Sequence, residues 1–84
     1  MSGALEAVIK ERKRQDRLLS EGRLNHLASE PLCPDVLRLA ALMEEVGEVA
    51  RAVHDGPAGG DLRAELIQVA AVAVGWVEGL DASA

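Results

Sequence analysis

The sequence predicts an all-α protein built from three helices. Apolar residues recur at spacings of three and four, and no segment alternates apolar and polar side chains as a half-buried strand would. Proline and glycine gather in short segments that divide the chain into three helical stretches. With 84 residues and no internal repeat, we expect one domain covering residues 1–84.

The first helix is expected over about Ala4 to Glu21, with Gly22 as its terminator. Its apolar residues lie at the two ends, whereas residues 10–17 are polar on every side. Residues 10–23 carry a net charge of +3 in a chain whose net charge is −5. This basic helix is either a solvated face or the partner of an anionic ligand.

The second helix is expected to begin at Pro34 and Asp35, after a connection over residues 23–33. Proline fits a first helical turn, and a carboxylate there faces the positive end of the helix dipole. The helix extends to about His54, and residues 55–60, DGPAGG, form a loop. Its apolar stripe comprises Leu42, Val46, Val49 and Val53, with Leu39 alongside.

The third helix is expected from Asp61, a suitable capping residue, to about Gly79. Between Leu66 and Val77 only Gln68 is polar, and a helix that is apolar nearly all round is buried on several sides. One chain of this length cannot cover such a helix, and domains this small are marginal without a staple or a partner. We therefore expect a homo-oligomer.

Composition excludes several classes of protein. An acidic chain with one Trp, no Phe and no Tyr lacks the basic surface and stacking platforms of a nucleic-acid binder. The single cysteine, Cys33, cannot form an internal disulfide and does not support a zinc site. The longest apolar stretch is shorter than the roughly 20 residues of a membrane span, and the first residues do not resemble a signal peptide. We expect a cytoplasmic protein.

Acidic residues cluster on the second helix. Glu48 neighbours both Glu44 and Glu45 on the helix surface, and like charges at this spacing repel. Glu45 and Glu48 flank the apolar stripe, whereas Glu44 is turned toward solvent. On the third helix Glu65 and Gln68 share a face, either as a first-turn acid and a satisfied core amide or as part of a polar site.

The two polar groups are predicted to face each other. A tight loop makes the second and third helices antiparallel, which places Glu45 and Glu48 at about the level of Glu65 and Gln68. Oxygen ligands without histidine or thiol favour Mg²⁺ or Mn²⁺ over zinc. The sequence therefore predicts a divalent-cation site across this hairpin.

These residues resemble a known family. EEVGE at residues 44–48, followed after sixteen residues by Glu-Leu-x-Gln at 65–68, is similar to the EExxE and ExxD motifs of MazG-like all-α nucleotide pyrophosphohydrolases. The segments ERKRQ at 11–15 and ELIQVAAVAVGW at 65–76 look like those of the short subgroup that includes phage and mobile-element proteins. The resemblance implies a helical hairpin that dimerises into a four-helix bundle, or pairs again into a tetramer.

The family hydrolyses nucleoside or deoxynucleoside triphosphates to monophosphate and pyrophosphate. By resemblance, Glu45, Glu48 and Glu65 would be Mg²⁺ ligands, and Gln68, where the family has Asp, would offer a neutral oxygen. Glu44 or Glu48 would act as the base. Lys10 and Arg14 are the first candidates to neutralise pyrophosphate, and Gln15 and Arg38 are further candidates for substrate contact.

Two alternatives remain open at this stage. The chain could bind nucleotide and metal with little turnover, because Gln68 removes one anionic ligand. It could instead be a helical oligomerisation or regulatory module whose acids are only a solvated face.

Overall fold

The computed structural model describes residues 3–22 and 33–84. Its helices are α1 (Gly3–Ser20), α2 (Asp35–Asp55), the short 3₁₀ helix η1 (Gly56–Gly59) and α3 (Leu62–Ser83). The described residues contain no strand, which confirms the all-α class. The expected connection over residues 23–33 lies outside the described residues except at Cys33, and α3 continues past its expected end at Gly79 to Ser83.

Local sequence signals set the helix ends. Gly22 follows α1 with φ 73°, a left-handed conformation that favours glycine. Pro34 precedes α2 in an extended conformation, and Asp35 is the first helical residue. Asp61 caps α3, because its Oδ1 accepts a hydrogen bond from the backbone N–H of Ala64 at 3.1 Å.

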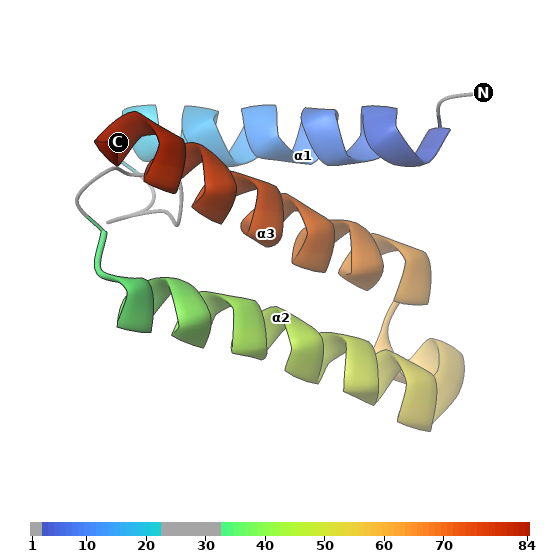
Figure 1. The fold of residues 1–84 in the computed structure, drawn as a ribbon. Helices are drawn as coiled ribbons and strands as arrows, with labels where there is room; N and C mark the ends of the chain where they lie inside the picture. The colour runs from blue at the N-terminus through green and yellow to red at the C-terminus, as the bar shows by residue number, and fades with distance from the viewer. Residues whose placement is uncertain (1–2, 23–32) are drawn as a thin grey trace.

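The helix α3 lies between α1 and α2 and contacts both (Figure 1). It runs antiparallel to α2, as the short connection predicts, and in the same direction as α1. The N-terminal half of α3 is therefore level with the N-terminal half of α1 and with the C-terminal half of α2. The polar segment in the middle of α1 therefore lies beside the part of α3 that carries Glu65 and Gln68.

Two polar contacts fasten the outer helices to α3. The indole Nε1 of Trp76 donates a hydrogen bond to Asp35 Oδ1 at 3.1 Å, which ties α3 to the start of α2. Arg12 on α1 pairs with Glu78 on α3, where Arg12 Nη2 lies 2.7 Å from Glu78 Oε1. Together with the η1 connection, these contacts hold α3 in register with both neighbours.

Small residues form most of the buried interior. Ala52 and Ala71 are 4% and 0% exposed, and no large side chain among the described residues is fully buried. The predicted α2 stripe divides, since Leu42 and Val49 are partly buried whereas Val46 and Val53 are exposed. Exposed aliphatic side chains form a stripe on each hairpin helix, which we call the hairpin stripes: Val36, Leu39, Met43, Val46 and Val53 on α2, and Leu62, Leu66, Val77 and Leu80 on α3.

One helix of the described part, α3, is long and apolar enough to cross a membrane by length and composition. The core helix of a soluble protein passes the same test. In this fold α3 lies between α1 and α2, yet only 17% of its most apolar 18-residue stretch is buried within one chain.

Candidate functional site

The carboxylates of α2 lie as the helical spacing predicts. Glu45 and Glu48 are partly buried at the edge of the interior, and Glu44 is exposed. Arg51 approaches Glu48, with Nη1 4.0 Å from Oε2; the Arg51 side chain is 63% exposed and that of Glu48 44%. An exposed pair at this distance contributes little energy, so Glu48 keeps its carboxylate available.

Glu45 is the electrostatic centre of the group. Burial raises the pKa of Glu45, and the nearby carboxylates of Glu65, Glu48, Glu44 and Glu11 raise it further. These neighbours come from all three long helices. Glu65 on α3 is thus close enough to Glu45 on α2 to raise its pKa, and we call Glu11, Glu44, Glu45, Glu48 and Glu65 the acidic group.

Glu11 joins this group from α1, which the sequence analysis did not foresee. Its Oε1 accepts from Arg14 Nε and its Oε2 from Arg14 Nη2, both at 2.8 Å. The pKa of Glu11 is lowered, first by Arg14 and then by hydrogen bonds from Gln68 and Gln15, against the opposing effect of burial. Helical spacing was the available signal: Val8, Glu11, Gln15 and Leu18 continue one stripe through the polar middle of α1.

The amide of Gln68 suits this environment. Gln68 is partly buried on α3 and lines the same pocket as Glu11 of α1, whose pKa it helps to lower. An aspartate at this position would instead add a carboxylate beside Glu11 and Glu65. The neutral side chain of Gln68 thus lies beside an acid supplied by α1.

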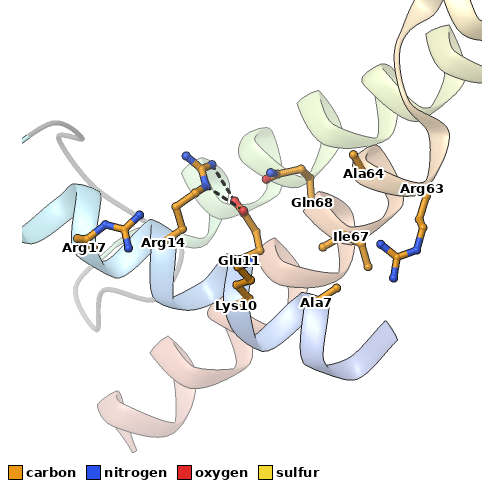
Figure 2. Close-up of a pocket in the computed structure, with 9 residues that line it drawn as sticks. All are labelled: Ala7, Lys10, Glu11, Arg14, Arg17, Arg63, Ala64, Ile67 and Gln68. Carbon is orange, nitrogen blue, oxygen red and sulfur yellow. Dashed lines mark hydrogen bonds and ion pairs between the residues drawn. The ribbon is translucent and has the colours of Figure 1, made fainter. Parts of the chain in front are cut away.

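A pocket of about 410 Å³ opens beside Glu11 and Gln68, between α1 and α3 (Figure 2). Its lining includes Lys10 and Arg14, which the sequence analysis gave as the first candidates to neutralise pyrophosphate. It also contains Arg17 and Arg63, which were not singled out; the first lies on the basic helix and the second in the first turn of α3. The full lining is Ala7, Lys10, Glu11, Arg14, Arg17, Arg63, Ala64, Ile67 and Gln68.

Gln15 and Arg38, the other predicted substrate contacts, do not line this pocket. Gln15 is 8% exposed and accepts a hydrogen bond from Arg12 Nη1 at 3.0 Å. Arg38 is 3% exposed and pairs with Asp35, with Nη1 2.9 Å from Oδ1. In this conformation both side chains support the helix packing.

The acidic group has the chemistry of a hard-cation site but is not gathered as one. Carboxylate oxygens are the ligands that Mg²⁺ and Mn²⁺ prefer. Within residues 3–22 and 33–84, no group of three or more His, Cys, Asp or Glu side chains is placed to hold a metal ion. Mutual repulsion keeps the ionised carboxylates apart, and a bound cation would draw them together.

The chain was compared with family models, curated proteins and solved structures, and no match was found in any of the three. The functional argument therefore rests on the residues and geometry of this chain.

Proposed function

We propose that this protein is a Mg²⁺-dependent nucleoside triphosphate pyrophosphohydrolase of MazG-like type. The observation that carries the proposal is that carboxylates from α1, α2 and α3 lie near enough to Glu45 to raise its pKa, next to a pocket lined by four basic side chains. Carboxylates that would hold a cation therefore lie next to cationic side chains that would bind phosphate oxygens. Phosphoryl transfer requires both, because the cation and the cationic side chains together stabilise the negative charge of the transition state.

The donor set fits a divalent cation in its chemistry. Glu45, Glu48 and Glu65 would hold it, with the side-chain oxygen of Gln68 as a neutral further donor. A bound Mg²⁺ would neutralise phosphate charge as the bond between the α and β phosphates breaks. It would also relieve the repulsion that raises the pKa of Glu45.

The remaining steps belong to side chains of the chain itself. Glu48 or Glu44 accepts a proton from the water that attacks the α-phosphorus, and both carry carboxylates that reach solvent. The bond from the α-phosphorus to the bridging oxygen breaks, which yields monophosphate and pyrophosphate. Lys10 and Arg14 stabilise the charge that develops on the departing pyrophosphate.

We further propose that the protein works as a homo-oligomer, a dimer that forms a four-helix bundle. Thirteen large aliphatic or methionine side chains in the described residues are exposed, between 40% and 74%. Nine of them form the hairpin stripes, which supports burial of α2 and α3 against a second copy, because exposed apolar surface is costly in water.

The same exposed stripes favour one competing function, a helical oligomerisation module without catalysis. The two functions differ in what the acidic group does. In a module the acids are a solvated face, so a divalent cation would not stabilise the fold, whereas a preorganised site gains stability from bound ligand.

The decisive test is pyrophosphate release from the common ribonucleoside and deoxyribonucleoside triphosphates, with and without Mg²⁺. We expect metal-dependent release that is abolished in Glu48→Ala and retained in Asp81→Ala, which removes an exposed acid from the far end of α3. Orthophosphate as the direct product would refute cleavage between the α and β phosphates. Mg²⁺-dependent stabilisation without release from any triphosphate would favour a non-catalytic nucleotide-binding protein.

A further inference from the structure

A chain of polar contacts crosses α1 from α3 to the pocket that holds Lys10 and Arg14. It begins at Glu78 of α3, whose Oε1 accepts a hydrogen bond from Arg12 Nε at 2.9 Å. Arg12 Nη1 donates to Gln15 Oε1 at 3.0 Å, and the Nε2 of Gln15 donates to Oε2 of the next acid, Glu11, at 3.4 Å. The contacts end at Arg14, which donates to both oxygens of that acid at 2.8 Å. A residue of the pocket is therefore connected to α3 through side chains that lie under α1.

Arg12 fixes the orientation of the Gln15 amide. Both side chains are buried, and an amide has one accepting oxygen and one donating nitrogen. Because a guanidinium can only donate, Arg12 binds the oxygen of Gln15 and leaves the amide nitrogen to face Glu11. The reversed amide would place an oxygen against a carboxylate and a nitrogen against a guanidinium, and both contacts would repel. Gln15 therefore has one stable orientation, with an N–H directed at Glu11.

Glu11 in turn holds Arg14 in place (Figure 2). The Glu11 side chain is 11% exposed, whereas that of Arg14 is 47% exposed. A long exposed arginine side chain samples many rotamers, and ordering it costs up to about 2 kcal/mol. A nearly buried carboxylate that accepts from Gln15 on one side and Arg14 on the other orders the guanidinium before a ligand binds.

Arg14 keeps hydrogen-bond donors for a ligand while Glu11 holds it. A guanidinium has five N–H groups in a planar fork. Glu11 binds the N–H of Nε and one N–H of Nη2, which leaves both N–H groups of Nη1 and the second of Nη2. One edge of the fork is therefore bound to protein, and the opposite edge can donate two parallel hydrogen bonds to phosphate oxygens.

We propose that Gln15 is a positioning residue for Arg14, acting through the carboxylate of Glu11. The inference rests on the proposed function, in which Arg14 stabilises the charge on the departing pyrophosphate. Donors that are already oriented toward developing charge lower the barrier because they do not reorganise during the reaction. Loss of the Gln15 amide should therefore slow the chemical step rather than weaken substrate binding.

The first test is steady-state hydrolysis by the full chain and its variants. Gln15→Met removes the amide without changing length or charge, and we expect kcat to fall about tenfold while KM changes less than about twofold. In an Arg14→Gln background the same change at Gln15 should have no further effect, because the group that it positions is gone. Glu78→Gln is the control: it disturbs Arg12 but leaves the contact between Gln15 and Glu11, so kcat should be unchanged.

The second test does not depend on turnover. The Arg14 Nε–H, which donates to Glu11, should give a side-chain NMR signal that is protected from exchange with water, and Gln15→Met should reduce this protection. Thermal unfolding shows whether each variant is folded. If Gln15→Met does not fold, Glu11→Gln replaces it in both tests, because Glu11→Gln keeps one accepting oxygen but loses the paired contact with Arg14.

Additive effects of Gln15→Met and Arg14→Gln on kcat, or equal losses in Gln15→Met and Glu78→Gln, would overturn the inference. An Arg14 Nε–H signal that is unchanged in Gln15→Met would overturn it as well. An unmodified chain that hydrolyses no triphosphate would refute the proposed function, whereas the Arg14 signal would still decide whether Gln15 orders this side chain. The two proposals therefore fail on different measurements.

Discussion

Arg12 and Glu78 link the first and third helices through a paired contact to one oxygen. Nε of Arg12 donates to Glu78 Oε1 at 2.9 Å, and Nη2 lies 2.7 Å from the same atom. The Arg12 side chain is 8% exposed, and its remaining donors reach Gln15 at 3.0 Å and Asp16 at 3.1 Å. All three nitrogens of a nearly buried guanidinium therefore contact protein acceptors, which identifies Arg12 as a structural residue of α1.

Removing Arg12 should destabilise the fold more than removing its partner. Arg12→Ala loses a buried stem and leaves Gln15 without its donor, so we expect a loss of about 2–3 kcal/mol in the free energy of unfolding. Glu78→Gln keeps a neutral acceptor at a half-exposed position and should cost about 1 kcal/mol or less. Urea unfolding measures both. The exposed neighbour Lys13→Ala is the control, and an equal loss there would contradict a structural role for Arg12.

Stability without metal should depend on pH through Glu45. Its pKa is raised in the folded state from an ordinary value of 4.5, so the folded protein binds the proton more tightly than the unfolded chain. This contribution is present at low pH and is lost as the pH rises above 4.5 through the raised pKa. In EDTA we therefore expect Glu45→Gln to be more stable than the unmodified chain at about pH 7, with the difference vanishing near pH 4.

Asp81→Asn provides the control for this pH series, because Asp81 is exposed and distant from the acidic group. Glu11 acts in the opposite sense. Its lowered pKa stabilises the fold above 4.5, and this contribution is lost as the pH falls through the lowered value. If the stability of Glu45→Gln relative to the unmodified chain increased toward acid pH, this would contradict the raised pKa of Glu45 and the repulsion from its neighbouring carboxylates.

Replacing Gln68 by aspartate should make stability depend more strongly on Mg²⁺. The variant replaces the neutral amide beside Glu11 with a carboxylate, so repulsion between the two acids should lower its Tm in EDTA. Mg²⁺ should then raise the Tm of Gln68→Asp more than that of the unmodified chain, because the site gains an anionic ligand. Gln68→Ala removes the amide without adding charge, and an equal Mg²⁺ shift in both variants would contradict a metal site at this position.

Two glycines should respond to alanine in opposite directions. A Cβ at Gly59 in η1 would collide with the backbone carbonyl oxygen of Arg51, so we expect Gly59→Ala to cost about 1–3 kcal/mol. A Cβ at Gly47 in α2 meets no atom within 4 Å, and alanine favours a helix interior by about 0.5–1 kcal/mol. Thermal unfolding compares the pair, and destabilisation by Gly47→Ala would show that another molecule packs against this glycine.

The hairpin stripes should set the oligomeric state. Met43 is 56% exposed in the middle of the α2 stripe, and a charge there would be buried in a helical dimer. We expect Met43→Glu to reduce the mass in solution to that of a monomer or to unfold the chain. Leu5→Glu changes an exposed apolar residue on α1, outside both stripes, and should leave the dimer intact. Light scattering after size exclusion measures this, and a monomeric unmodified chain would refute the proposed bundle.

Local signals in the sequence determined the helices and four of the five residues of the acidic group. Helix bounds follow from capping by Asp61, the positive φ of Gly22 and the proline at 34, all of which act over a few residues. The opposition of Glu45 and Glu65 was also predictable, because a tight loop leaves an antiparallel hairpin little freedom of register.

Only the tertiary structure decided where α1 lies. The connection over residues 23–33 does not specify which face of the hairpin the first helix covers, so the contacts of Glu11 could not be derived from spacing. Packing of α1 along α3 brought Glu11 and Gln68 into one pocket, placed Arg63 in that pocket with Lys10 and Arg14, and buried Gln15. These outcomes depend on long-range burial and charge pairing, which neighbouring residues in the sequence do not encode.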